Sequence, residues 1–298
     1  MSEIIFIGSK RSGFEVLKKI YSLCADKILK VITFDDRVDI RSCFDDYCSF
    51  VKERGLELLI INPMGLDFAL KEFSGKKVFL VGWYYLIPEP LLEKNDFYAI
   101  HYSYLPKYRG NAPVVWQIIN GEKNIGVTLF KISTGMDDGD YIVRESFTLE
   151  EGDDVLSALL KADDLAVDII DRYLQCILDG SVKLCPQNNE EATYCSLRTP
   201  DDGRIDWQWS VENIINFIRA QSYPYPGAYT IDSSGNKIYI TKAVVDCREI
   251  YAPIGAVFER SREGITIKCG DGSIKILEAN AGREKDLLKL FKSLKTRL

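Results

Sequence analysis

Short apolar runs that alternate with amphipathic segments limit the fold of this chain more than any other feature. Residues 3–8 form the first run, and the apolar positions that follow have helical spacing: Leu17, Ile20, Tyr21 and Cys24. Similar runs return at 28–34, 57–63, 76–83 and 97–104. Apolar runs without a period of two are typical of strands buried on both faces. The first half therefore predicts an α/β domain with a parallel sheet.

The second half has a different pattern. A long amphipathic helix is predicted from Asp153 to about Leu178, and a polar stretch at 186–192 then predicts a surface linker. We expect one domain at 1–188 and a second at 189–298, which suits a chain of 298 residues. After one helix that Ser210 would cap, short β-rich segments predict a small antiparallel barrel: 228–231, 237–245, 256–261, 265–268 and 274–279.

Charge and cysteine content exclude several classes of protein. The chain has 38 basic and 44 acidic residues, a net charge of −6, so nucleic acid is a poor first partner. Its apolar runs fall short of the roughly 20 residues that span a bilayer, so we expect a cytoplasmic protein that does not bind membranes. The 8 cysteines form no C-x-x-C pair and the chain has 1 histidine, so we expect reduced thiols and no metal.

The turn from Gly8 to Gly13 joins the first strand to the first helix. Backbone amides at a helix N-terminus can hold an anion, and Ser9, Lys10 and Arg11 could contribute. The spacing matches neither a P-loop nor the G-x-G-x-x-G pattern. An anion site and a plain solvated turn both stay open.

His101, the only histidine, ends a predicted buried strand. Ligands bind at that edge of open α/β sheets, and histidine is suited to transferring protons near neutral pH. A carboxylate beside it would orient the ring, and the segment 133–140 offers Asp137, Asp138 and Asp140. The alternatives are a structural histidine and a solvated acidic loop, and spacing alone does not choose among the three aspartates.

The segment His-x-Ser-x-Leu-Pro-x-Tyr-Arg-Gly at 101–110, followed by Gly-Glu at 121–122, Gly-Val-Thr at 126–128 and Asp-x-Gly-Asp at 137–140, resembles the formyltransferases that use 10-formyltetrahydrofolate. Residues 198–207 and 224–228 resemble the C-terminal domain of methionyl-tRNA and UDP-4-amino-4-deoxyarabinose formyltransferases. The resemblance implies a Rossmann-like domain with a mostly parallel sheet, then a small OB-like antiparallel barrel.

The resemblance also implies roles for individual residues. His101 would be catalytic, with Asp137 as its partner. The cosubstrate 10-formyltetrahydrofolate would contact Trp83, Tyr84, Tyr85, Asn111, Ser133, Thr134, Gly135 and Met136. Candidate contacts to the second substrate are Ser9, Lys10, Arg11, Ser103 and Arg109.

One position departs from the family pattern. The family usually has a catalytic asparagine two positions before the histidine, where this chain has Ala99. Losing a donor to a developing oxyanion commonly costs about 10²–10³ in kcat. Another group or a water could supply the donor, the chain could be a site-directed variant, or the protein could bind its ligands and catalyse poorly.

The charge distribution of the chain indicates which class of formyl acceptor to expect. The segment 35–50 has five aspartates against Arg37 and Arg41, which is the wrong sign for gripping tRNA. A nucleotide-linked amino deoxysugar needs only a few donors and one stacking ring. We therefore expect a sugar N-formyltransferase of O-antigen or other cell-surface polysaccharide synthesis, and a homodimer would be compatible with it. The alternatives are a methionyl-tRNA formyltransferase, an impaired folate- or nucleotide-binding relative and, least favoured, a glycinamide formyltransferase.

Overall fold

The computed structural model describes residues 3–298, which form two compact units. The first unit contains the chain up to Pro113 together with 124–148 and 159–196. The second contains 114–123, 149–158 and 197–298. The polar stretch at 186–192, which the sequence predicts as a surface linker, is part of the first unit.

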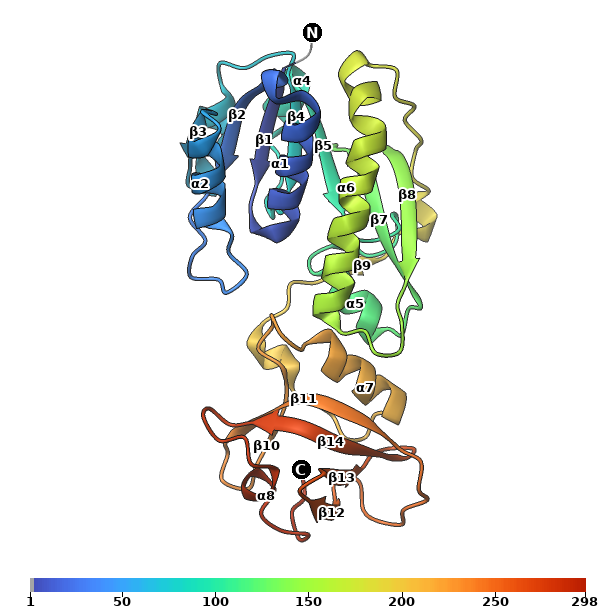
Figure 1. Cartoon of the computed structure of the whole chain (residues 1–298). Helices are drawn as coiled ribbons and strands as arrows, with labels where there is room; N and C mark the ends of the chain where they lie inside the picture. The colour runs from blue at the N-terminus through green and yellow to red at the C-terminus, as the bar shows by residue number, and fades with distance from the viewer. Residues whose placement is uncertain (1–2) are drawn as a thin grey trace. The chain divides into compact units, whose positions relative to one another are not determined.

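A seven-stranded sheet forms the centre of the first unit, in the order β3-β2-β1-β4-β5-β7-β8 (Figure 1). The strands from β3 to β5 are parallel, β7 pairs antiparallel with β5, and β8 pairs antiparallel with β7. The predicted mostly parallel sheet is confirmed. The strand bounds are β1 Ile4–Gly8, β2 Ile28–Thr33, β3 Leu58–Ile60, β4 Lys77–Val81, β5 Asp96–His101, β7 Asn124–Lys131 and β8 Tyr141–Thr148.

Helices cover both faces of this sheet because each presents an apolar stripe. One buried cluster joins the sheet to the first group of helices, α1 (Lys10–Cys24), α2 (Phe44–Glu53) and α6 (Val155–Asp179). A second cluster, on the opposite face, contains residues of α3 (Leu66–Leu70) and α4 (Glu89–Lys94). The short 3-10 helices of this unit are η1 (Ala25–Lys27), η2 (Pro63–Gly65) and η3 (Asn189–Glu191).

The second unit is built on a five-stranded antiparallel sheet in the order β10-β11-β14-β13-β12. The strand bounds are β10 Ala228–Ile231, β11 Lys237–Asp246, β12 Val257–Ser261, β13 Gly264–Lys268 and β14 Ser273–Asn280. The helices are α5 Pro113–Ile119, η4 Pro200–Gly203, α7 Val211–Ala220 and α8 Leu287–Leu290. Ser210 caps α7, its hydroxyl accepting from the amide of Asn213 at 3.2 Å, and all five predicted strands are present.

The eight cysteines are free thiols. Across residues 3–298, none of the helices combines the length and apolar character needed to cross a membrane.

Candidate active site

His101 is the last residue of β5, and its imidazole is nearly buried. Both ring nitrogens have neighbours within the first unit. Nε2 lies 2.7 Å from the carbonyl oxygen of Tyr108, and Nδ1 lies 3.6 Å from Oδ2 of Asp137. The carboxylate that spacing could not select is therefore placed beside the ring by the fold.

These contacts define the protonation pattern of the ring. A carbonyl oxygen only accepts hydrogen bonds, so Nε2 must donate the proton it shares with Tyr108. In the neutral imidazole, Nδ1 is then the nitrogen with a free lone pair. A proton that arrives at Nδ1 creates a positive charge close to the Asp137 carboxylate, which stabilises it. The geometry is that of a histidine base supported by a carboxylate.

The other two aspartates of the 133–140 loop have different surroundings. The hydroxyl of Ser133 donates to the carboxylate of Asp138, and Asp140 is exposed. Asp137 is further fixed because its Oδ2 accepts from the amide of Gly110 at 2.7 Å. The structure thus gives each carboxylate of this loop a distinct environment, and only that of Asp137 includes an imidazole.

The loop after His101 packs tightly on β7. The hydroxyl of Thr128 donates to the carbonyl of Ser103 at 2.6 Å. Gly126 is required because a Cβ there would lie 2.1 Å from the backbone nitrogen of Tyr104. Ser103 itself is fully buried and its hydroxyl donates to the carbonyl of Lys107 at 2.6 Å, so this predicted substrate contact stabilises its own loop.

The side chain of Arg109, another predicted substrate contact, is 2% exposed. Its Nη2 donates to Oε1 of Gln187 at 2.8 Å and to Oδ1 of Asn189 at 2.7 Å. The guanidinium therefore binds the segment after β8 and α6 within its own unit.

Residues of the first turn also have partners in the protein. Ser9 donates to the carbonyl of Gly82 at 2.7 Å. Nζ of Lys10 lies 2.6 Å from Asp36 and 2.9 Å from Asp39. Nε of Arg11 lies 3.3 Å from Asp163. Lys10 and Arg11, which the sequence predicts as possible anion contacts, thus lie close to carboxylates of the protein itself.

The predicted folate residues come from two loops of the first unit. Trp83 contacts Tyr85, with ring centroids 5.5 Å apart, and packs against the same apolar cluster as Ala99 and Ile132. The indole Nε1 of Trp83 is buried without a hydrogen-bond partner in the protein. Tyr84 is 54% exposed and Tyr85 is 48% exposed, so a bound ring could cover them.

The second loop runs from Ser133 to Asp137. Met136 lies at Gly110, because a Cβ on that glycine would be 3.2 Å from the Met136 sulfur. Met136 is preceded in the loop by Ser133, Thr134 and Gly135. Asn111 follows Gly110, and its backbone N–H donates to the carbonyl of Cys195 at 3.2 Å. Met136 therefore contacts Gly110, the residue whose backbone amide also donates to Asp137.

Asp163, on α6, is a buried acid that the sequence analysis missed. Its Oδ1 accepts from the hydroxyl of Tyr102 at 2.6 Å, directly after His101 in the chain. Burial raises the pKa of Asp163 to about 6, although Tyr102 and Arg11 act in the opposite direction. The sequence gives no signal for this acid, because the apolar residues at helical spacing along α6 indicate only an amphipathic helix.

Asp163→Asn is expected to stabilise the protein at pH 8. The folded protein binds the Asp163 proton more tightly than the unfolded chain, whose aspartate pKa is about 3.9, so this group lowers stability as pH rises from about 4 to about 6. Removing the buried charge should raise the free energy of unfolding by about 1–3 kcal/mol at pH 8 and by much less at pH 4. Urea unfolding at both pH values measures this, and a variant less stable at pH 8 would contradict it.

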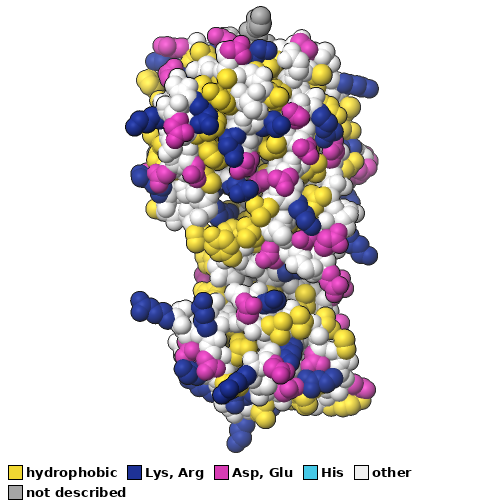
Figure 2. Space-filling view, in the orientation of Figure 1, with side chains coloured by type: hydrophobic (Ala, Val, Ile, Leu, Met, Phe, Trp, Pro, Cys, Tyr) yellow, Lys and Arg dark blue, Asp and Glu magenta, His cyan; other side chains and the backbone are white. Residues whose placement is uncertain are grey.

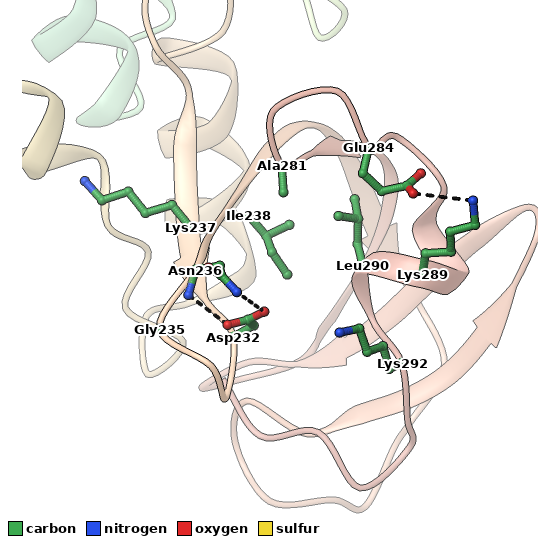
Figure 3. Close-up of a pocket in the computed structure, with 10 residues that line it drawn as sticks. All are labelled: Asp232, Gly235, Asn236, Lys237, Ile238, Ala281, Glu284, Lys289, Leu290 and Lys292. Atoms are coloured by element: carbon green, nitrogen blue, oxygen red, sulfur yellow. Dashed lines mark hydrogen bonds and ion pairs between the residues drawn. The ribbon is translucent and has the colours of Figure 1, made fainter.

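Two further features bear on the chemistry of the chain. In residues 3–298, no three His, Cys, Asp or Glu side chains are grouped to hold a metal ion. A cavity of about 700 Å³ in the second unit lies between the β10–β11 turn and α8 (Figure 3). Several of its charged groups have partners within the protein: Nζ of Lys289 lies 3.4 Å from Glu284, and Asn236 donates to Asp232 at 3.2 Å (Figure 3). None of the predicted site residues lines it.

Comparison with known proteins gives consistent matches. Residues 62–170 match the domain family described as formyl transferase, and residues 198–293 match the formyl transferase C-terminal domain. The methionyl-tRNA formyltransferase of Caldanaerobacter subterraneus is 32% identical over 92% of this chain and 91% of that protein.

Solved structures share the fold. The N-formyltransferase of Helicobacter canadensis, in complex with folinic acid and dTDP-3-aminofucose, aligns with a TM-score of 0.73 and 20% identity over 93% of this chain and 99% of that one. A sugar 3N-formyl transferase in the presence of dTDP and 5-N-formyl-THF aligns with a TM-score of 0.68 and 24% identity, covering 93% of this chain and 97% of that one.

Proposed function

This chain belongs to the formyl transferase family, and from that premise we propose that it moves a formyl group from 10-formyltetrahydrofolate to the amine of a nucleotide-linked amino deoxysugar. The observation that carries the choice of acceptor is the carboxylate pairing of the basic residues near the first turn. The solved relatives hold dTDP or a dTDP-amino sugar together with a folate, which supports the same pair of ligands here.

The loops at Trp83–Tyr85 and Ser133–Met136 would hold the folate cosubstrate, which supplies the formyl group when bound. The buried Nε1 of Trp83 has no partner in the protein, and a ligand rich in acceptors would satisfy it. The half-exposed rings of Tyr84 and Tyr85 offer surfaces for stacking. These features fit a folate, and we assign the loops to it on that basis.

The residues at β5 would move one proton. As the acceptor amine forms its bond to the formyl carbon, Nδ1 of His101 takes the proton that the amine loses, and the Asp137 carboxylate stabilises the imidazolium. Nε2 keeps its hydrogen bond to Tyr108 throughout, so the ring does not turn. The same proton then passes from Nδ1 to N10 of the folate as the bond between N10 and the formyl carbon breaks. The transfer is direct and needs no covalent enzyme intermediate.

Methionyl-tRNA is the second candidate acceptor, because the curated relatives that match most of the chain carry that name. The charges of segment 35–50 oppose it. Arg37 lies 2.5 Å from Asp35, and Arg41 lies 2.7 Å from Asp39, a residue that also binds Lys10. On the face shown in Figure 2, basic side chains are interspersed with acidic ones. Binding of tRNA depends on phosphate neutralisation, which such paired cations supply poorly.

Binding measurements test the choice of acceptor. Isothermal titration with dTDP-, UDP- and GDP-linked amino sugars, with a folate analogue present, should find one that binds with micromolar affinity. Initiator methionyl-tRNA should bind weakly at 50 mM salt and not measurably at 200 mM, since its binding would rest on charge alone. Tight tRNA binding at 200 mM salt, with no binding of any amino sugar, would overturn the sugar assignment.

Ala99→Asn is expected to raise kcat by about tenfold or more. Positions 99 and 101 lie on the same face of β5, so an amide at 99 would add a donor next to His101 for the oxygen that gains charge. Steady-state turnover of the variant and the wild type measures this. An unchanged kcat would contradict the prediction and show that another group already supplies the donor.

A further inference from the structure

We propose that Gln187 and Thr193 position the two neighbours of the His101 imidazole, Asp137 and Tyr108, so that these two residues of the polar segment 187–193 serve the catalytic apparatus. The inference rests on the proposed function, because it assigns a role within that reaction. Gln187 would act through Asp137 and would touch neither substrate, which makes it a positioning residue.

The two partners of His101 have an unusual backbone. Tyr108, whose carbonyl accepts from Nε2, has φ of 61°, and Asp137, whose carboxylate faces Nδ1, has φ of 50°. A non-glycine residue in this left-handed region costs on the order of 1–3 kcal/mol and persists only where surrounding contacts hold it. The question is therefore which contacts hold these two residues.

Gln187 holds Asp137. Its Nε2 donates to the carbonyl of Asp137 at 2.8 Å and to the carbonyl of Gly139 at 2.7 Å. Its Oε1 accepts from Nη2 of Arg109 at 2.8 Å and from Nε at 3.2 Å. Every donor and acceptor of the amide is used, so its orientation is fixed. Arg109 is buried and belongs to the loop after His101, which ties the amide to that loop.

Thr193 holds Tyr108. Its hydroxyl accepts from the amide of Tyr108 at 2.8 Å, and its carbonyl accepts from the amide of Arg109 at 2.9 Å. The contact continues as a short parallel pair between β6 (Arg109–Gly110) and β9 (Tyr194–Cys195). The segment 187–193 therefore holds both Asp137 and Tyr108 by hydrogen bonds, although it lies fifty or more residues beyond Asp137 in the chain.

Loss of the Gln187 donors would leave two backbone carbonyls without partners and would release the Asp137 turn. The carboxylate would then no longer be held opposite Nδ1, although His101 and the Trp83–Tyr85 loop would remain in place. Because a small misplacement of a catalytic group can cost about 100-fold, we expect kcat to fall about 10- to 100-fold with little change in KM.

Gln187→Glu is the informative variant, because it keeps the acceptor for Arg109 and the side-chain length while removing both N–H donors. Asn188→Ala is the matched control: Asn188 is the next residue, is exposed, and bonds only within its own turn, to Glu190 and Glu191. The control should keep wild-type kcat. If Gln187→Glu fails to fold, Thr193→Val gives the same test through Tyr108.

Two readouts separate positioning from a general loss of stability. In an Asp137→Asn background, Gln187→Glu should lower kcat less than threefold further, since the group it positions is already impaired. In ¹⁵N spectra of the apo protein, the single imidazole should show protonated Nε2 in the wild type and in Asn188→Ala, and changed shifts in Gln187→Glu.

The outcomes distinguish this inference from the proposed function. Equal losses of kcat in the wild-type and Asp137→Asn backgrounds, or unchanged imidazole shifts in Gln187→Glu, would overturn the positioning role. If the wild type turned over no acceptor, the proposed function would fail, and the imidazole shifts alone would still decide the role of Gln187.

Discussion

His101→Asn is expected to lower kcat by about 10²–10⁴-fold, the usual contribution of a general acid–base group. An asparagine at 101 cannot take a proton from the acceptor amine or pass one to the departing nitrogen. Steady-state formyl transfer at saturating substrates measures the loss. Since the chain has 1 histidine, no neighbouring imidazole can replace it.

The folded state provides the control for this variant. His101 is nearly buried and its Nε2 bonds to Tyr108, so a stability change must be excluded by unfolding curves at the assay temperature. A folded His101→Asn protein that binds the folate analogue but does not turn over would fit the account. A folded variant with near wild-type kcat would assign proton transfer to a different group.

Asp137→Asn is expected to lower kcat by about 100-fold or more, with KM for both substrates changing less than threefold. In the wild type, the Gly110 amide donates to Oδ2 of Asp137. Asparagine keeps an oxygen for this amide but lacks the negative charge that stabilises His101 when Nδ1 is protonated. Carboxylates that orient a catalytic histidine have effects of this size or larger in other enzymes. The measurement is again kcat and KM, with folding checked separately.

Asp140→Asn is the matched control for Asp137, because Asp140 belongs to the same loop and is exposed. Its turnover should stay within twofold of the wild type. Equal losses in the two variants would mean that the loop needs its total charge, and that Asp137 has no special role beside His101.

Apolar patterning predicts the fold well because it depends on burial alone. The runs at 28–34, 76–83 and 97–104 become β2, β4 and β5, all buried within the first sheet. The run at 57–63 yields only the three residues of β3, since Pro63 begins a 3-10 helix and β3 is an edge strand with one neighbour.

Single charged residues are harder to predict, because their partners lie far away in the chain. Lys10 looks free for an anion in sequence, but Asp36 and Asp39 reach it from the loop after β2. Asp163 meets Arg11 across 152 positions of sequence. Spacing within a motif carries no information about such pairs.

The site is predictable only in part for the same reason. His101 can be found because the end of a buried strand marks the ligand edge of an α/β sheet. Gln187 has no local signal: it lies in a polar run typical of a linker, and its importance comes from two carbonyls at Asp137 and Gly139. Only the folded chain brings those groups together.

The most direct test of the central claim is a competition assay with both acceptor classes. Purified protein would receive 10-formyltetrahydrofolate labelled in the formyl group, a panel of dTDP-, UDP- and GDP-linked amino sugars, and initiator methionyl-tRNA. We predict that the label appears on the amine of one amino sugar and that His101→Asn abolishes it. Label on methionyl-tRNA, with none on any sugar, would contradict the proposed function.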